Sequence, residues 1–228
     1  MTKNKYAVVS GGTKGIGRAI CEKLLSHGFT VFTSARHKDY SFQHNNLHQF
    51  QADFSIKSAV LAFAEEIKKH TNVVDILVNN VGVFMPGKIT EEEDLAFETQ
   101  INTNLASTYH LTRALIAEVK KSSKPYIFNI CSTASITAYI NGGSYCISKY
   151  AQLGLTKVLR EELKEFKIKV SAILPGATYT DSWSNSDLPK ERFIKPESIA
   201  SLLFAAYEID DNMVMEEILV RPMDGDIS

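Results

Sequence analysis

The order of the first 36 residues constrains the fold of this chain more than any other feature. Residues 6–10 form a short apolar run that ends at two glycines, and residues 16–25 repeat apolar side chains at a spacing of three or four. Residues 30–34 are rich in β-branched and aromatic types. These patterns predict a strand, a tight turn, an amphipathic helix and a second strand. Because such a unit is parallel and right-handed, the chain begins as an α/β protein.

The same alternation continues along the rest of the chain. Apolar side chains at helical spacing predict a second helix that contains Val60, Phe63, Ala64 and Ile67. Further strands are predicted at 48–52, 73–78, 126–131, 168–174 and 217–221, and further helices at 91–121, 144–166 and 196–208. The fold class is therefore α/β, a Rossmann-type doubly wound parallel sheet of about seven strands with helices on both faces. Since no low-complexity linker divides the chain, we expect a single domain over residues 1–228.

The composition narrows the possible partners. Hydrophobic residues make up 44% and charged residues 22% of the 228 positions, which is typical of a globular protein. The net charge of −1 argues against binding to nucleic acid or to an anionic membrane. The sequence lacks an apolar stretch near the roughly 18 residues of a membrane span, and its first residues lack the core of a signal peptide. We expect a cytoplasmic protein that acts on a small molecule.

The cysteines and histidines suggest neither disulfides nor a metal. Cys21, Cys131 and Cys146 are odd in number and have no CxxC or Cys/His spacing. We therefore expect reduced, packed thiols rather than a disulfide framework or nucleophiles. The six histidines share no HExxH or similar pattern, so no metal site is predicted.

A glycine-rich turn lies between the first predicted strand and helix, with glycines at 11, 15 and 17. Glycine permits a sharp turn and lets a pyrophosphate approach the backbone, while the helix N-terminus offers free N–H groups to phosphates. The spacing is GxxxGxG, which differs from the GxGxxG dinucleotide fingerprint. Taken alone, the turn also fits a glycine-rich loop without a ligand.

Tyr145 and Lys149 lie four residues apart at the start of the predicted helix 144–166, so both project from one face. A nearby ammonium favours the phenolate and thereby makes a tyrosine a better acid–base catalyst near neutral pH. Chance alone predicts about 0.75 such pairs in a chain of this composition. An exposed pair on a helix surface is therefore the alternative.

Further motifs follow in order along the chain. Residues 79–82 are Asn-Asn-Val-Gly after a predicted strand, Ser132 lies 13 residues before Tyr145, and residues 175–176 are Pro-Gly after another strand. With the glycine turn, this order resembles the short-chain dehydrogenases/reductases over nearly the whole chain. The resemblance places the family's catalytic tetrad on Asn104, Ser132, Tyr145 and Lys149.

The resemblance implies hydride transfer between NADP(H) and a carbonyl or alcohol substrate, in the reductive direction. Tyr145 would protonate the carbonyl oxygen, and Ser132 would hydrogen-bond the same oxygen. Lys149 would lower the pKa of Tyr145 and hold the nicotinamide ribose, and Asn104 would hold a water that feeds protons to Lys149. The structural alternatives are an ordinary strand-end hydroxyl for Ser132 and a polar break in a long helix for Asn104.

The resemblance also assigns the cofactor-binding residues. Asp53 would contact the adenine, although an Asp after a strand is also a common helix cap. The full set is Gly11, Thr13, Lys14, Gly15, Ile16, Gly17, Arg36, Asp53, Asn80, Gly82, Tyr145, Lys149, Pro175, Gly176, Thr178 and Thr180.

The end of the second predicted strand indicates NADP(H) rather than NAD(H). An acid there would bind the ribose 2′-hydroxyl and repel a 2′-phosphate. This chain has Ala35 where NAD-preferring relatives carry Asp, followed by Arg36, whose guanidinium can bind a phosphate through two hydrogen bonds. Lys14 adds a second cation. Asp39 is the opposing possibility, because a turn could direct its carboxylate toward the ribose.

The chain departs from the family pattern at Ser10, at Val81 and in a shorter C-terminal part, and its substrate stays open. Tyr179, Trp183, Leu188 and Phe193 suggest a partly apolar lid, or a loop packed on its own side chains. The family associates through two long helices, here 91–121 and 144–166, which implies a homodimer or homotetramer. On the second helix, the apolar residues Leu153, Val158 and Leu159 suggest a contact with a second copy of the chain. Packing within one chain is the alternative explanation for them.

Two other functions fit parts of the sequence. A catalytically idle dinucleotide sensor would keep the glycine turn but would not need all four tetrad residues. A methyltransferase would share the turn and the sheet, yet it would not require Ser132, Tyr145 and Lys149 at these spacings.

Overall fold

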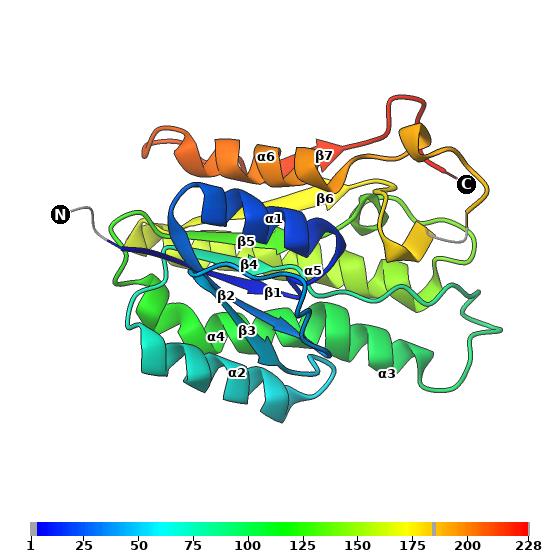
Figure 1. The fold of residues 1–228 in the computed structure, drawn as a ribbon. Helices are drawn as coiled ribbons and strands as arrows, with labels where there is room; N and C mark the ends of the chain where they lie inside the picture. Colours follow the sequence, from blue (N-terminus) through cyan, green and yellow to red (C-terminus); the bar gives the residue numbers. More distant parts are fainter. Residues whose placement is uncertain (1–3, 184–185, 228) are drawn as a thin grey trace.

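The computed structural model describes residues 4–183 and 186–227. These residues form a seven-stranded, wholly parallel sheet with the strand order β3-β2-β1-β4-β5-β6-β7 (Figure 1). This order confirms the predicted Rossmann-type doubly wound sheet. The strands are β1 Lys5–Ser10, β2 Phe29–Ala35, β3 Leu47–Gln51, β4 Ile76–Asn79, β5 Tyr126–Ile130, β6 Lys169–Pro175 and β7 Glu217–Val220.

Helices cover both faces of the sheet. Helices α1 and α6 pack together on one face, and α2 and α4 pack together on the other, next to α5 (Figure 1). A π-helical segment, Ile101–Ala106, joins α3 to α4 without a break. The helices are α1 Gly15–Ser26, α2 Lys57–His70, α3 Ala96–Gln100, α4 Ser107–Val119, α5 Gly143–Leu163 and α6 Pro196–Glu208, with short 3₁₀ turns at Thr133–Ser135, Lys164–Phe166, Asp181–Trp183 and Lys190–Arg192.

The central strands are buried on both faces, which explains their continuous apolar sequences. Along β1, the side chains of Ala7 and Val9 join the core under α1 and α6, while Val8 joins the core under α2 and α4. This alternation is the two-residue period of a strand. A sheet that is covered in this way leaves its loops at the two edges, where a ligand can reach them.

The predicted helix 91–121 begins later and is less regular than its periodicity suggests. It starts at Ala96, after Leu95 has adopted a left-handed backbone conformation with a φ of 70°. Before that point, the carboxylate of Glu92 accepts hydrogen bonds from the N–H and the hydroxyl of Ser144, at the start of α5. A tertiary contact therefore overrides the local helical preference at 91–95.

The carboxyl ends of β1, β4, β5 and β6 meet at one edge of the sheet, and the order reverses between β1 and β4. This reversal is where open α/β sheets bind their ligands. In the turn after β1, Gly11 and Gly15 have φ values of +69° and +51°, which favour glycine. A Cβ on Gly17 would lie only 2.2 Å from the carbonyl oxygen of Gly11. The turn therefore requires glycine at all three positions.

The packing of Gly17 leads to the first prediction. In Gly17→Ala, the new methyl group meets a backbone oxygen that cannot move aside, so the free energy of unfolding should fall by about 2 kcal/mol or more. The control is Glu22→Ala on the exposed side of the same helix, which should change it by less than about 0.5 kcal/mol. Urea unfolding followed by circular dichroism measures both. Equal stability of the two variants would contradict this account of the turn.

Candidate active site

The glycine turn is braced by residues from neighbouring strands. The N–H of Gly12 donates to Thr33 Oγ1 on β2, at 2.9 Å. From the segment after β4, Asn80 Nδ2 donates to the carbonyl oxygens of Ser10 and Gly11, at 2.9 and 3.1 Å. The first amide groups of α1 have no partner within the helix, as at any helix start. The turn is thus a rigid cradle that presents backbone N–H groups at the β1–β4 reversal.

The structure brings the four predicted tetrad residues to the neighbouring part of the same edge. Ser132 follows β5, Tyr145 and Lys149 lie on α5, and Asn104 lies in the π-helical segment. The side chain of Ser132 lies close enough to Tyr145 to lower the pKa of the Tyr145 hydroxyl, against the effect of burial. Lys149 and Asn104 are almost completely buried. A Cβ on Gly82 would lie 3.5 Å from both Lys149 Nζ and Asn104 Oδ1, so Gly82 lies directly beside these two buried groups.

Opposing effects act on the hydroxyl of Tyr145. Burial raises the pKa of the Tyr145 hydroxyl, and the side chain of Ser132 opposes this only in part. The ammonium of Lys149 lies 5.9 Å from the centre of the Tyr145 ring and is not among the groups that shift its pKa. Desolvation is the largest cause of the shift in this structure, and the lowering of this pKa by Lys149 stays a prediction.

Lys149 is directed toward two oxygens instead. Its Nζ donates to the carbonyl oxygen of Ile130 at 3.0 Å and to Gln152 Oε1 at 2.9 Å. Burial lowers the pKa of Lys149 to about 8. The sequence analysis missed Gln152, although its position three residues after Lys149, on the same side of a helix, was an available signal.

Asn104 holds the segment after β4 against the helices. Its Oδ1 accepts from the N–H of Val83 at 2.7 Å, and its Nδ2 donates to the carbonyl oxygen of Val83 at 3.0 Å and to Ser148 Oγ at 2.9 Å. The surrounding backbone is π-helical, a form that often marks functional sites. Asn104 therefore interrupts the regular α-helix, as the structural alternative predicted. It is also the residue that the resemblance assigns to the tetrad.

Near the end of β2, the structure forms an ion pair that the sequence did not predict. Asp39 Oδ2 binds Arg18 at 2.8 Å, and its Oδ1 accepts from the hydroxyl and N–H of Ser41 at 2.6 and 2.9 Å. These Ser41 hydrogen bonds, together with the charge of Arg18, lower the pKa of Asp39. Its carboxylate is therefore held by Arg18 and Ser41 in this structure. Arg36 directly follows the last residue of β2.

Two further predicted cofactor residues have partners of their own. Lys14 Nζ pairs with Asp181 at 2.8 Å, and both side chains are largely exposed. This hydrogen bond raises the pKa of Lys14, while the nearby charge of Arg36 opposes it. Asp53 Oδ1 accepts from the N–H and hydroxyl of Ser55 at 2.9 and 2.7 Å, which lowers the pKa of Asp53. Asp53 does not cap α2, whose first turn lacks a side-chain cap.

The segment after β6 lies over the glycine turn. Thr178 Oγ1 donates to the carbonyl oxygen of Gly176 at 3.0 Å, and a Cβ on Gly15 would lie 2.9 Å from the methyl group of Thr180. Pro175 ends β6, Thr13 is buried in the turn, and Ile16 packs into the core. Farther along, the rings of Tyr179 and Trp183 contact Phe193, so this segment packs in part on its own side chains. Leu188 remains exposed.

Comparison with known proteins decides the family. A family model described as short chain dehydrogenase matches residues 5–191. The chain belongs to the short-chain dehydrogenase family. The family comprises oxidoreductases, so the predicted family and the coarse chemistry are both confirmed.

Similar proteins support this assignment. Sepiapterin reductase of Chlorobaculum tepidum is 34% identical over 177 residues, which cover 77% of this chain and 72% of that protein. The structure of a metagenomic short-chain oxidoreductase in complex with NADP is 28% identical, has a TM-score of 0.83, and covers 96% of this chain and 97% of its own. An alcohol dehydrogenase of Thermococcus sibiricus complexed with 5-hydroxy-NADP is 22% identical with a TM-score of 0.89, covers 99% of this chain and 100% of its own, and supports the fold alone.

The remaining reactive side chains of this dehydrogenase family member lie outside the site chemistry. Cys21, Cys131 and Cys146 are free and buried, and burial raises the pKa of Cys21 to about 12 and of Cys131 to about 11. Within residues 4–183 and 186–227, no three His, Cys, Asp or Glu side chains gather to hold a metal ion. A search of those same residues found no helix with the length and apolar character of a membrane span.

Proposed function

We propose that this chain is a carbonyl reductase that uses NADP(H), working in the cytoplasm as one domain over residues 1–228 on a small-molecule carbonyl or alcohol substrate. The observation that carries the proposal is the gathering of Ser132, Tyr145, Lys149 and Asn104 from separate elements at the sheet edge that also carries the glycine turn, with Ser132 close enough to lower the pKa of Tyr145. Ser132 follows β5 while Tyr145 lies on α5, and the buried ammonium of Lys149 lies 5.9 Å from the centre of the Tyr145 ring. A substrate oxygen placed beside Ser132 and Tyr145 would meet both hydroxyls.

The residues around the turn fit a dinucleotide phosphate. Gly11, Gly15 and Gly17 allow the tight packing of the turn against Val81, Asn80 and Thr180, and the start of α1 contributes N–H groups and a partial positive charge. Arg36 and Lys14 would face the ribose 2′-phosphate, and Asp53 and Asn80 would border the adenine and the turn. The segment with Pro175, Gly176, Thr178 and Thr180 would border the nicotinamide, together with Gly82.

Within this arrangement, the side chains act on the substrate oxygen. The cofactor supplies the hydride when bound. Tyr145 stays protonated at neutral pH because burial raises its pKa, and this is the form that donates a proton during reduction. Ser132 Oγ accepts from the N–H of Ala134 at 3.1 Å, which leaves its own proton to donate to the same oxygen.

A catalytically idle dinucleotide sensor is the alternative. It would need the glycine turn, but it would not need Ser132, Tyr145 and Lys149 together at the same sheet edge. A spectrophotometric screen of NADPH oxidation with aldehydes, ketones, quinones, sugars and 3-oxoacyl thioesters separates the two functions. Binding of NADPH without oxidation by any of these classes would favour the sensor.

The hydroxyl of Tyr145 provides the most direct test of the proposed chemistry. In Tyr145→Phe, the ring keeps its contact with Phe84, so the Kd of NADPH should change by less than about twofold while kcat falls by about 100-fold or more. Lys149→Ala should both lower kcat and weaken the binding of NADPH. Tyr150→Phe, on the exposed side of the same helix, is the control and should keep full turnover. Undiminished turnover in Tyr145→Phe would refute the assignment.

Cofactor choice depends on Arg36 and Lys14. We expect NADPH to bind at least about tenfold more tightly than NADH if each cation contributes on the order of 1 kcal/mol. The preference should weaken as salt rises and should shrink in Arg36→Ala. Lys23→Ala, in the last turn of α1, is the matched control. Calorimetry decides the point: equal affinities, or a preference that survives the loss of Arg36, would overturn it.

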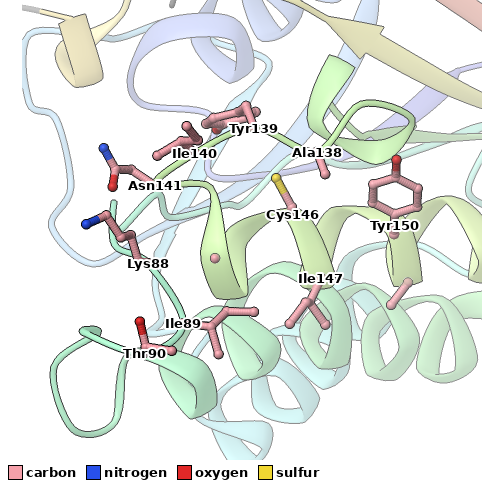
Figure 2. A pocket seen from close by; sticks show the side chains of 12 residues that line it. Lys88, Ile89, Thr90, Ala138, Tyr139, Ile140, Asn141, Cys146, Ile147 and Tyr150 are labelled. Atoms are coloured by element: carbon pink, nitrogen blue, oxygen red, sulfur yellow. The ribbon is translucent and has the colours of Figure 1, made fainter.

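The outer face of α5 leads us to propose a homodimer or homotetramer. A groove of about 880 Å³ lies along this face, between α5 and the segments 88–90 and 138–141 (Figure 2). Ile147, Tyr150 and Val158 are exposed on the helix, and nothing lies within 4 Å of a Cβ on Gly154. Of the side chains that suggested association, only Val158 is exposed, because Leu153 is buried and Leu159 packs on the core. The open face is thus different from the predicted one.

Light scattering tests the association. The native protein should show a mass two or four times 25.4 kDa, since an exposed apolar helix face favours pairing with a second copy. Val158→Glu should shift the mass toward the monomer, whereas Tyr40→Glu, at another exposed aromatic position, should not. A monomer mass that is independent of the wild-type concentration would exclude the oligomer.

A further inference from the structure

Gln152 is a fully buried amide on the inner side of α5, one turn after Lys149. A buried primary amide is costly unless its donors and its acceptor are hydrogen-bonded. Here Oε1 accepts from Lys149 Nζ at 2.9 Å, and Nε2 donates to Thr108 Oγ1 on α4 at 3.1 Å. The side chain of Gln152 is therefore held by hydrogen bonds at both its oxygen and its nitrogen.

These contacts continue in one direction to the π-helical segment. Thr108 Oγ1 donates to the carbonyl oxygen of Asn104 at 3.3 Å, so its oxygen is available to accept from Gln152. An ammonium can only donate, which requires the oxygen of the Gln152 amide to face Lys149 and the nitrogen to face Thr108. The donors therefore run from Lys149 through Gln152 and Thr108 to the backbone of Asn104, and every member of the chain is nearly or fully buried.

Few of the groups around Lys149 favour its charged form, so the amide oxygen of Gln152 is important for the ammonium. Tyr145 lies near it on α5, the carbonyl oxygen of Ile130 ends β5, and Cys131 is the one charged or titratable group that raises its pKa. No carboxylate is among the groups that shift the pKa of Lys149. Against strong desolvation, the ammonium is thus supported by two neutral oxygens, and Gln152 supplies the only one that comes from a side chain within the described residues.

We propose that Gln152 is a positioning residue, which holds the ammonium of Lys149 in place, keeps it charged and ties it to α4 through Thr108. This inference rests on the proposed function for its catalytic meaning, but the geometry stands without it. Gln152→Leu removes the acceptor and leaves the ammonium with Ile130 alone. Gln152→Glu keeps the shape and puts a carboxylate at 2.9 Å from Nζ, if its oxygen takes the place of Oε1.

Titration of Lys149 itself tests the proposal without a substrate. In protein labelled with ¹³C at lysine Cε, the Lys149 signal is assigned by its loss in Lys149→Arg. The midpoint should move down by about 0.5 pH unit or more in Gln152→Leu, since a neutral oxygen that favours the cation is lost, and up by about 1 unit or more in Gln152→Glu. The alkaline limb of kcat/KM should move in the same two directions.

Thr156→Val is the control for a purely structural effect. Thr156 is buried one turn farther along α5, where its Oγ1 accepts from Asn129 Nδ2 at 2.8 Å. Its loss should lower stability and leave the Lys149 midpoint unchanged. An unmoved midpoint in both Gln152 variants, or an equal shift in Thr156→Val, would overturn the proposal. If Gln152→Leu does not fold, Gln152→Glu alone decides by the direction of its shift. Shifted midpoints without carbonyl reduction would refute the proposed function and leave the role of Gln152 intact.

Discussion

Parallel pairing between β1 and β4 is the constraint on which the rest of this structure depends. Because Ala7 pairs with Ile76 and Val9 with Val78, the ends of the two strands reach the same edge together. The glycine turn after β1 then lies directly against Asn80, which hydrogen-bonds its carbonyl oxygens. Parallel strands need crossover helices, and the helices in turn bury both faces of the sheet. The glycine turn and the candidate catalytic residues thereby lie at the same edge.

The polar groups at that edge are held by contacts between elements that are far apart in the chain. Asn79 Nδ2 donates to Thr112 on α4 and to Asn129 on β5, at 3.0 and 2.8 Å, and Asn129 in turn donates to Thr156 on α5. These hydrogen bonds offset the cost of burying the two amide nitrogens, while Asn79 Oδ1 has no partner among the described residues. The network joins α4 and α5 to the central strands.

Burial, rather than proximity of charge, sets the acid–base properties of the candidate site. The same desolvation raises the pKa of Tyr145 and lowers that of Lys149 to about 8, so it favours the neutral form of both groups. A neutral tyrosine is the acid that carbonyl reduction needs. Because burial favours the neutral form of Lys149, its ammonium needs a hydrogen-bond acceptor in order to stay charged. The Oε1 of Gln152 accepts a hydrogen bond from this ammonium.

The sequence by itself determined the alternation of strands and helices, the glycine turn and the shared face of Tyr145 and Lys149. These features depend on periodicity and local geometry, which neighbouring residues carry. Only the tertiary structure decided that Asp39 pairs with Arg18, that Leu153 is buried, and that Lys149 points to Gln152. Such outcomes depend on partners from other elements and on the water that packing removes, and desolvation has no signature in the spacing of residues along the chain.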